Sequence, residues 1–551
     1  MKEEIKHINP DSLNDMEGLR SALRIVMQAL ESMSKELAGL KEENRKLKDE
    51  INRLKGEQGR PVIKGKIGPK HGVSKDSVPK KENKNHKTGK NKRHLEIDET
   101  IELREVAEPL PTDARIRSWE DRVVQDIVLH RRTVKYRIAV YYSASEGKTY
   151  RAEFPMEGYN SFGPTLRALL HLLYYECDVT QGRLEAFCDS LGLDISAGSI
   201  DNILKSQGES AVLERGEILW AGIAHSEYVH TDSTSSKEKG ISLYTQIFCS
   251  PLFEAYLSNN TKSRLQVLQA LCGLEDLASL PAIFNEDTDL LLAYFKVPQR
   301  YQQPLRAFWS AQGGSNIGQL KAWIDRELPK LGGQKNTLAH VLDAFALGHY
   351  FRREDFPTLR ALMSDDAPEY KLLSPLHALC WIHDARDYKK LIPQLDINRR
   401  QTDIFLDEYW AFYRKLLKYK TCDQTAQNLE KPLLDGEFER IFTQRTGYEN
   451  LDKLIARTHT KKTQLLYVLD HPYLPLHNNT AELAARRKVR KRDVCLHTMS
   501  ANGTRIQDAY LSIIGTAKKL GISAFEYLAD FVSASRKMTP LPHLIALHAS
   551  G

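Results

Sequence analysis

SEYVHTDST, at residues 226–234, is the stretch that decides the fold, because it predicts a β-strand that ends in an acidic residue, Asp232. Two further strand-like runs follow it, SLYTQIFCSP at 242–251 and LFEAYLSNN at 252–260, and the three together predict a meander. A sheet holds an acidic residue at a strand end in place, while the loop beyond leaves room for a substrate. Asp232 is therefore the first candidate functional residue.

A second acidic residue occurs in the same setting further along the chain. TLRALMSDDAPEY at 358–370 predicts a strand from Thr358 to Met363, which Asp365 follows directly. HALCWIH at 377–383 predicts the next strand of the sheet. Strand ends of such a mixed sheet are where ribonuclease-H-like nucleases hold a metal ion, so Asp365 is the second candidate.

The third acidic residue is Glu482, near the start of a helix predicted in PLHNNTAELAARRKVRKR at 475–492. Three carboxylates from separate segments suit two-metal phosphoryl transfer, because hard divalent ions prefer oxygen ligands and keep several waters. We expect Asp232, Asp365 and Glu482 to be catalytic and to bind two Mg²⁺ or Mn²⁺ ions. No convincing serine or tyrosine nucleophile motif accompanies them.

The composition is that of an ordinary multi-domain protein. At 551 residues the chain predicts three or four units, and 41% hydrophobic with 27% charged residues allows a real core. The sequence contains no apolar run of about eighteen residues, so no membrane span is predicted. The opening MKEEIKHINPDS lacks the apolar core of a signal peptide, so secretion is not expected. The seven cysteines form no CxxC pair, so we expect no zinc site and a reducing cytoplasm.

The N-terminal segment carries a heptad repeat. Apolar residues are spaced alternately four and three residues apart from Leu19 to Leu54, and Asn44 occupies the same seam position as Leu23. This period predicts a coiled coil over residues 19–54, in which a single polar seam residue commonly holds a parallel dimer in register. A long helix packed on the protein body is the alternative.

Two further segments suggest contact with nucleic acid. Residues 59–94 are rich in Lys, Gly and Pro, which predicts a flexible tether that either solubilises the chain or holds DNA phosphates. Residues 161–222 look helical, and QGRLEAFCDSLGLDISAGSIDNILKS predicts two short helices around a turn at Gly192, the second capped by Ser196. Helix-turn-helix spacing of this kind also occurs in domains that bind no DNA.

The predicted fold class is a multi-domain α/β protein with a coiled coil, a helical DNA-binding region and a ribonuclease-H-like catalytic core that contains a large helical insertion. The predicted domains are 1–58 for the coiled coil, 59–94 for the basic linker, 95–160 for a small β-rich module without zinc ligands, 161–222 for the helix-turn-helix-like region, 223–261 with 353–500 for the catalytic core, 262–352 for the insertion and 501–551 for the C-terminal helices.

Several strings resemble one known family. HTDST at 230–234, SDDAPEY at 364–370 with CWIH at 380–383, and PLHNNTAEL at 475–483 resemble the three acidic motifs of the insertion-sequence-66 family of DDE-type transposases. ANGTRIQDAYLSIIGTAKKLGISAFEYLADF at 501–531 resembles the closing helices of the same family. The likeness runs over most of the chain.

The resemblance implies a transposase that binds double-stranded DNA, both transposon ends and target, as a homodimer or larger assembly with accessory transposition proteins. It implies cleavage of the transposon end and attack of the freed 3′-hydroxyl on target DNA, at the nucleoid in a bacterial cytoplasm. A catalytically inactive, transposase-derived DNA-binding regulator is the alternative. A metal-dependent nuclease that joins no ends is a third possibility.

Two departures from the family pattern are local. Family members usually carry a zinc-binding cysteine cluster in the region of residues 95–160, which here contains no cysteine, so no zinc is expected. Leu483 follows the third acid where the family usually has arginine.

The third departure concerns the second acid. Asp232 and Asp365 are further apart in the sequence than the family usually has them, so Asp287 and Asp289 remain alternatives, as does Asp366, the neighbour of Asp365. We prefer Asp365 because Tyr370 and the CWIH string follow it.

Residues near the third acid are expected to support it. Asn478 and Asn479 lie at the helix start, where one would cap backbone N–H groups and the other would bond water or DNA beside the metals. His383 would contact a substrate phosphate or lie buried with a hydrogen bond. The basic run beyond Glu482 predicts DNA contacts, with a solvated helix face as the alternative. Its members are Arg486, Arg487, Lys488, Arg490, Lys491 and Arg492.

Overall fold

A computed structural model describes part of the chain continuously and part of it in fragments. Single residues and short stretches are described between residues 19 and 129. No helix among the described residues is long and apolar enough to cross a membrane. The continuous stretches are 131–154, 161–310, 314–533 and 536–550.

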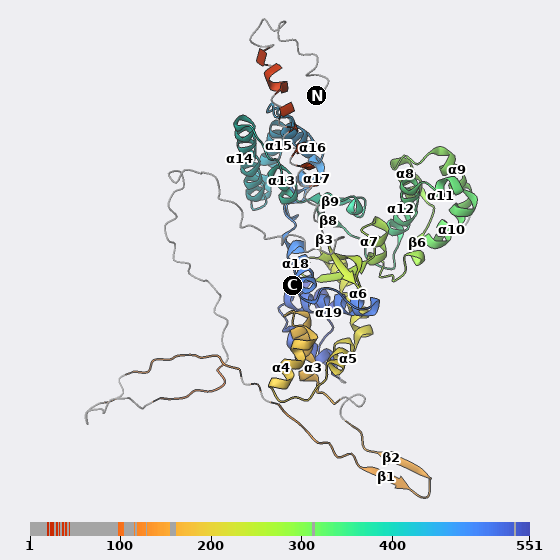
Figure 1. Ribbon diagram of the computed structural model, residues 1–551, viewed down its shortest axis with the longest axis vertical. Helices are drawn as coiled ribbons and strands as arrows, with labels where there is room; N and C mark the ends of the chain where they lie inside the picture. Colours follow the sequence, from red (N-terminus) through yellow and green to blue (C-terminus); the bar gives the residue numbers. More distant parts are fainter. Residues whose placement is uncertain are drawn as a thin grey trace, which may run out of the picture. The chain divides into compact units, whose positions relative to one another are not determined.

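The chain divides into two compact units. Met1–Glu31 and His130–Gly551 form the first unit, and Ser32–Leu129 forms the second. The sheet and all of the candidate site residues belong to the first unit (Figure 1).

The described residues between Leu19 and Glu43 are helical, in agreement with the heptad repeat. The apolar seam residues among them are exposed in the single chain. The remaining seam residues and residues 59–94 lie outside the described residues, so the coiled coil and the basic linker stay predictions. These seam residues are Asn44, Leu47, Ile51 and Leu54.

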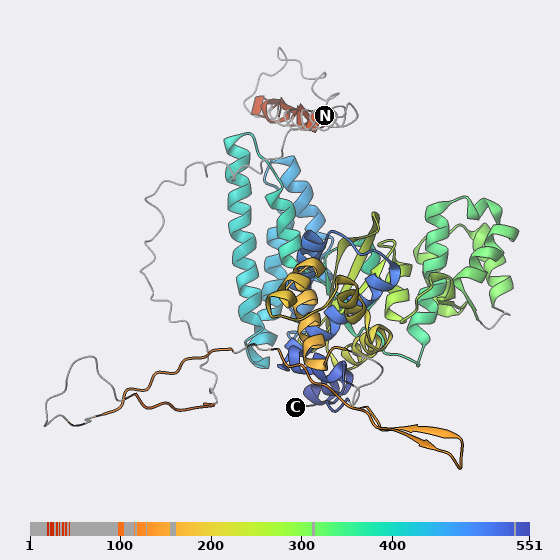
Figure 2. The same cartoon turned by 60° about the horizontal axis from the view of Figure 1, so that its bottom comes forward.

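Five strands form one mixed sheet in the order β5-β4-β3-β8-β9. β3 (Val229–Glu238), β4 (Ile241–Cys249) and β5 (Glu254–Asn259) pair antiparallel as the predicted meander. β8 (Ala361–Ser364) and β9 (Leu376–Leu379) continue the sheet parallel to β3. The predicted mixed α/β architecture is confirmed, and most described residues outside the sheet are helical (Figures 1 and 2).

β3 is longer than predicted, and Asp232 lies inside it rather than at its end. The parallel pairing of β3 with β8 stops at His230↔Met363, just before Asp232 and Asp365. The antiparallel pairing with β4 continues as far as Glu238. The prediction of a strand end at Asp232 was therefore wrong. What ends there is the contact between β3 and β8.

β9 ends at Leu379, and helix α13 (Trp381–Lys389) begins directly after Cys380. The CWIH string was predicted as a strand, but it is a strand end followed by the first turn of a helix. The reason is the buried Trp381 side chain, whose indole N–H donates to the carbonyl oxygen of Leu465 at 3.0 Å. His383 consequently lies on a helix.

Helices cover both faces of the sheet. In β4, alternate side chains point to opposite faces, as in any strand. Phe248 belongs to the large core that includes α6 (Gly208–His225). Its neighbours Ile247 and Cys249 belong to a smaller core with alanines of α18 (Asn479–Cys495). The helix that carries Glu482 therefore packs directly on the sheet that carries Asp232.

Helix α19 (Ala501–Lys519) covers the edge of the sheet along β5. The Ser512 hydroxyl accepts from the backbone N–H of Tyr256 at 2.9 Å. The Thr516 hydroxyl accepts from the N–H of Glu254 at 3.1 Å and donates to the carbonyl of the same residue at 3.1 Å. An edge strand has backbone groups without a strand partner, and burying them unpaired is costly. Two hydroxyl groups therefore allow this edge to be buried.

Helices α3 (Pro164–Tyr175), α4 (Gln181–Ser190) and α5 (Ala197–Lys205) lie directly before α6 in the sequence. The turn between α4 and α5 contains Gly192 at φ +69°, and Ser196 caps α5 through its side chain, both as predicted. DNA binding by this pair stays a prediction.

Two groups of helices interrupt the sheet in the sequence. The first lies between β5 and β8, within the predicted insertion at 262–352. The second lies between β9 and α18 (Figure 2) and was not predicted. It has an aromatic core around Trp381 and Tyr409. The first contains α7 (Arg264–Leu271), α8 (Glu286–Tyr294), α9 (Gln299–Trp309), α10 (Ile317–Glu327), α11 (Pro329–Gly332) and α12 (Lys335–Arg352), with β6 (Pro281–Ala282) and β7 (Ser315–Asn316). The second contains α13, α14 (Asp396–Tyr419), α15 (Gln424–Phe442), α16 (Glu449–His459) and α17 (Lys462–Leu466), and the chain closes with α20 (Ala524–Phe531) and α21 (Leu541–Ala549).

The region predicted as a small β-rich module contains less β-structure than expected. Within the described residues of 95–160 the strands are one hairpin, β1 (Val140–Ser143) with β2 (Lys148–Arg151), and its turn contains Gly147 at φ +62°. The apolar residues of this region, such as Val124, are largely exposed, so they build no core that would support more strands.

The role of the two α19 hydroxyl groups at the sheet edge can be tested by its effect on stability. Ser512→Ala and Thr516→Val should each lower the free energy of unfolding by about 1–3 kcal/mol, because each leaves a buried backbone group of β5 unpaired. Urea denaturation followed by circular dichroism measures the change. Asn502→Ala, at an exposed position of the same helix, is the matched control. Losses no larger than that of the control would contradict the described role of α19.

Candidate active site

Three different elements bring the predicted acids to one place. Asp232 lies in β3, Asp365 follows β8, and Glu482 lies in the first turn of α18. Because β3 and β8 run parallel, Asp232 and Asp365 lie beyond the same end of their contact. Because α18 packs on β3, Glu482 reaches the same region.

The pKa of Asp232 reports how close these charges are. The pKa of Asp232 is raised to about 6, mainly by burial and in smaller part by the charges of Asp365 and Glu482, while the backbone N–H of Ser233, which donates at 2.7 Å, lowers it. Lys262 acts in the opposite sense to the two acids. Three carboxylates that repel one another form a binding place for cations.

The side chains are not arranged as a finished metal site. In the part of the chain that the structure describes, no group of three or more His, Cys, Asp or Glu side chains is positioned to hold an ion. The donor set nevertheless suits Mg²⁺ chemically, because it offers carboxylate oxygens from three elements.

Glu482 is paired with an arginine on α13. Arg386 Nη2 donates to both carboxylate oxygens, at 2.9 Å to Oε1 and 2.8 Å to Oε2. Arg386 Nη1 also contacts His383 Nε2 at 2.9 Å. A guanidinium group only donates, so His383 Nε2 accepts and a neutral His383 carries its proton on Nδ1, 3.7 Å from Glu482 Oε1. Burial, followed by the charge of Arg386, lowers the pKa of His383 and favours this neutral form.

Asn478 joins β3, β9 and α18 through one buried amide. Its Oδ1 contacts His230 Nδ1 at 2.9 Å, and its Nδ2 donates to the carbonyl of Thr231 at 2.7 Å. Its backbone N–H donates to the Cys380 sulfur at 3.2 Å, and its carbonyl accepts from the N–H of Glu482 at 3.1 Å. Asn478 occupies the N-cap position of α18, but its side chain makes no capping bond. It positions the helix instead, while Asn479 is exposed on the first turn.

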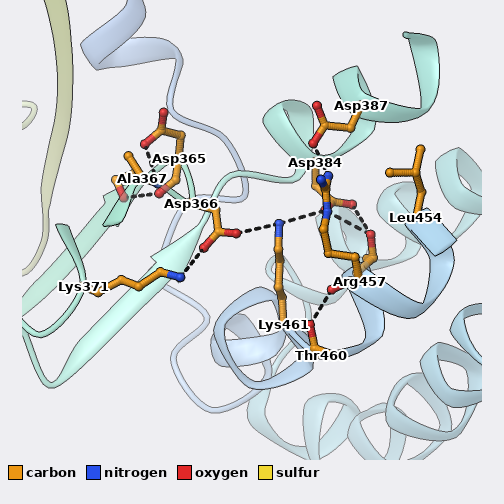
Figure 3. A network of polar contacts seen from close by, with 12 residues as sticks. Asp365, Asp366, Ala367, Lys371, Asp384, Asp387, Leu454, Arg457, Thr460 and Lys461 are labelled. Carbon is orange, nitrogen blue, oxygen red and sulfur yellow. Dashed lines mark hydrogen bonds and ion pairs between the residues drawn. The ribbon is translucent and has the colours of Figure 1, made fainter. Parts of the chain in front are cut away.

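Asp366, the neighbour of Asp365, is engaged elsewhere. Its carboxylate pairs with Lys371 at 3.2 Å and Lys461 at 2.9 Å, as Figure 3 shows. Burial alone would raise the pKa of Asp366, but these two lysines hold it below its usual range. Asp365 has no such ion pair in the described residues, and its Oδ1 accepts from the N–H of Ala367 at 3.2 Å. Of the two neighbours, Asp365 is therefore the one whose carboxylate is available to act with Asp232 and Glu482.

The other two alternatives lie on α8, in the helical insertion. Asp287 pairs with Arg352, and Asp289 pairs with Arg306, both at 2.5 Å. Neither contributes to the pKa of Asp232, whereas Asp365 and Glu482 do. The structure therefore brings Asp365, rather than Asp287 or Asp289, to the other two acids.

The basic run of α18 divides between the inside and the outside. Lys488 and Lys491 are 2% and 1% exposed, and Lys488 pairs with Asp508 at 2.6 Å, so the predicted DNA contact does not agree with their burial. Lys491 lies 3.5 Å over the ring of Tyr174. Two more residues of the basic run contact other parts of the protein, and two are exposed to solvent. Arg487 pairs with Glu254 and Arg492 bonds Ser235, while Arg486 and Arg490 are exposed.

Two cations of the site were missed from the sequence. Arg386 lies one helical turn after His383, a spacing that would have indicated a contact if CWIH had been interpreted as a helix start. Lys262 is exposed and close enough to Asp232 to affect its pKa. Nothing in its sequence context distinguishes Lys262 from other lysines.

Comparisons with known proteins identify the family of this chain. Residues 355–506 match the model of the Transposase IS66 family, a stretch that contains Asp365, Arg386 and Glu482. Uncharacterized protein y4jO of Sinorhizobium fredii (strain NBRC 101917 / NGR234) is 31% identical over 345 residues, which are 60% of this chain and 100% of the relative. The chain belongs to the IS66 transposase family. No solved structure matches this IS66-family chain.

Asn478 should be essential for positioning α18 in this IS66-family chain. Asn478→Ala removes the partners of His230 Nδ1 and the Thr231 carbonyl, both buried, and should lower the free energy of unfolding by about 2–4 kcal/mol. Chemical denaturation measures this loss. Asn479→Ala, which changes the exposed neighbour, should stay within about 0.5 kcal/mol of the unaltered chain. Equal losses in the free energy of unfolding for the two variants would show that Asn478 does not hold α18 in place.

Asp232→Asn should stabilise the metal-free chain at neutral pH. A raised folded-state pKa favours the protonated carboxyl, so stability is full below the unfolded-state pKa of about 4 and falls as the pH rises through about 6. Asparagine never ionises, so the variant should gain about 2 kcal/mol at pH 7.5 and nothing at pH 4. Unfolding in EDTA across this range tests it, with Asp289→Asn as control. Parallel stability curves for Asp232→Asn and the unaltered chain would contradict the repulsion described above.

Proposed function

We propose that the chain is a DDE transposase with a ribonuclease-H-like core, in which Asp232, Asp365 and Glu482 hold two Mg²⁺ or Mn²⁺ ions. The observation that carries the proposal is the convergence of these acids from β3, β8 and α18, which the raised pKa of Asp232 reports. The strand order β5-β4-β3-β8-β9, with an antiparallel meander and two parallel strands, supports the core assignment.

The residues present fit the proposed ions in chemistry. Carboxylate oxygens are the ligands that Mg²⁺ and Mn²⁺ prefer, and three of them leave positions for DNA oxygens. When bound, two such ions activate the attacking oxygen and stabilise the leaving one. The chain's own part is to hold the three carboxylates in β3, after β8 and on the first turn of α18, so that their spacing survives the binding of DNA.

DNA contacts in this proposal come from exposed cations around the acids. Arg486 and Arg490 lie on the outer face of α18, and Lys262 lies beside Asp232. Positive side chains here would neutralise the phosphates that approach three negative carboxylates. The α4–α5 pair and the basic residues 59–94 would hold the transposon ends.

In the proposed reaction the phosphodiester at the transposon end is hydrolysed and the freed 3′-hydroxyl attacks a target phosphodiester. No residue forms a covalent bond with DNA. Two chains, joined through the heptad seam of residues 19–54, would bring two ends together, with accessory proteins completing an assembly on the bacterial nucleoid in the cytoplasm.

Two alternative functions are compatible with the same acids and DNA-binding residues. An inactive DNA-binding regulator would bind ends without cutting them, and a metal-dependent nuclease would cut without joining. A strand-transfer assay with pre-cut, labelled ends and a plasmid target separates the three. The presence of all three acids favours the transposase over the regulator.

Neutral replacement of the acids tests the proposal. Asp232→Asn, Asp365→Asn and Glu482→Gln should each lower Mg²⁺-dependent end cleavage by about 10³-fold or more, because each removes a charged ligand, while end binding in gel-shift assays persists. Asp366→Asn and Asp289→Asn are matched controls and should keep cleavage within about threefold. Full cleavage by Asp232→Asn or Glu482→Gln would refute the assignment. Loss with Asp366→Asn but not Asp365→Asn would move the second acid by one residue.

A further inference from the structure

Arg386 holds Glu482 in a way that conflicts with metal binding. Its Nη2 donates to both oxygens of that carboxylate, at 2.9 and 2.8 Å, so each oxygen already faces a positive group. A divalent ion at the same oxygens would meet the guanidinium at close range, and like charges repel. Each oxygen keeps a second lone pair, but the repulsion between the ion and the guanidinium makes the two compete for this carboxylate.

We propose that Arg386 exchanges partners, neutralising Glu482 in the DNA-free chain and moving to a backbone phosphate when DNA binds. This inference rests on the proposed function, because it takes Glu482 as a metal ligand. It makes Arg386 a positioning residue for the third acid and a DNA contact of the site. Arginine suits both partners, since carboxylate and phosphate present pairs of oxygens to its planar group.

The surroundings of Arg386 allow the exchange. Its side chain is 44% exposed and that of Glu482 only 13%, so the cation forms the open side of the pair. In the described part of the chain, its hydrogen-bond partners are His383 and Glu482, both inside the site. A half-exposed ion pair is weak, so a phosphate that enters with DNA can compete for the guanidinium.

The helix that carries Arg386 is anchored independently of it. Buried Asp384 accepts from the Thr458 hydroxyl at 3.0 and 2.8 Å, and Asp387 pairs with Arg457 on α16. Figure 3 shows Asp384, Asp387 and Arg457 together on the side of α13 that faces α16. The exchange therefore requires the rotation of one side chain, and α13 stays in place.

The exchange links the two ligands of the site. DNA that removes Arg386 from Glu482 raises metal affinity, and metal at Glu482 frees Arg386 for DNA, by the same factor in both directions. A chain without DNA keeps its third acid neutralised. Cutting is thereby limited to chains that already hold a DNA backbone at the site.

Mn²⁺ titration of the full chain tests the exchange, with free Mn²⁺ followed by electron paramagnetic resonance. Without DNA, Arg386→Ala should bind Mn²⁺ about five- to tenfold more tightly than the unaltered chain, because Glu482 then lacks its counter-ion. A pre-cut transposon-end duplex, without target, should tighten Mn²⁺ binding by the unaltered chain to a similar extent. The same duplex should change Mn²⁺ binding by Arg386→Ala much less.

Arg440→Ala is the matched control, because Arg440 is 58% exposed and pairs with Glu408 of α14 rather than with Glu482 or a residue of α13. Its Mn²⁺ affinity should equal that of the unaltered chain with and without DNA. Arg386→Lys, which keeps the charge but forms a less rigid pair, should fall between the unaltered chain and Arg386→Ala. If thermal unfolding shows that Arg386→Ala does not fold, the lysine variant decides the question by the same comparison.

Glu482→Gln separates this inference from the function on which it rests. Unchanged or weaker Mn²⁺ binding by Arg386→Ala, together with weak binding by Glu482→Gln, would overturn the exchange and leave the metal site standing. Mn²⁺ binding by Glu482→Gln that equals that of the unaltered chain would overturn the proposed site itself. Tighter binding by Arg386→Ala that disappears in the double variant supports the exchange.

Discussion

One buried amide, the side chain of Asn478, is the contact on which the geometry of the site depends. It bonds His230 and the Thr231 carbonyl of β3 from the N-cap of the helix that carries Glu482. Both bonds lie within two residues of Asp232, so the separation of the first and third acids follows from them. An unpaired buried amide is costly, which makes this arrangement specific as well as stable. The backbone segments that carry Asp232 and Glu482 are therefore held together before any cation or DNA arrives.

Without a divalent ion, the structure handles the concentrated negative charge by three different means. Asp232 is buried, and its pKa of about 6 leaves it partly protonated near neutral pH. Glu482 is neutralised by Arg386. Asp366, next to Asp365, is neutralised by Lys371 and Lys461. The first two arrangements involve acids of the proposed metal site, so a divalent ion bound there would compete with both. Functional sites commonly carry such strain at the expense of stability.

The sequence predicted the strands and failed where a tertiary contact overrides a local pattern. The meander and the Ser196 cap depend on local spacing, so they were found. CWIH alternates like a strand, yet the buried Trp381 indole requires a helix start there, and Arg386 was missed with it. The helical group between β9 and α18 was missed because the catalytic core was assumed to run unbroken. The convergence of Asp365 with Asp232 depends on a short parallel pairing that no single-sequence pattern records.

The basic run of α18 could have been divided correctly from its period. Ala481, Ala484 and Ala485 mark the buried face, and residues three and four positions further on continue it. Lys488 and Lys491 fall on that face, whereas Arg486 and Arg490 do not. Lys488 pairs with Asp508 of α19 where both side chains are almost fully buried. A rotated α18 would leave a buried charge without its partner, at a cost of several kcal/mol. This pair therefore sets the rotation of the helix about its axis, and Asn478 sets its start. Together they direct Glu482 toward the acids of the sheet.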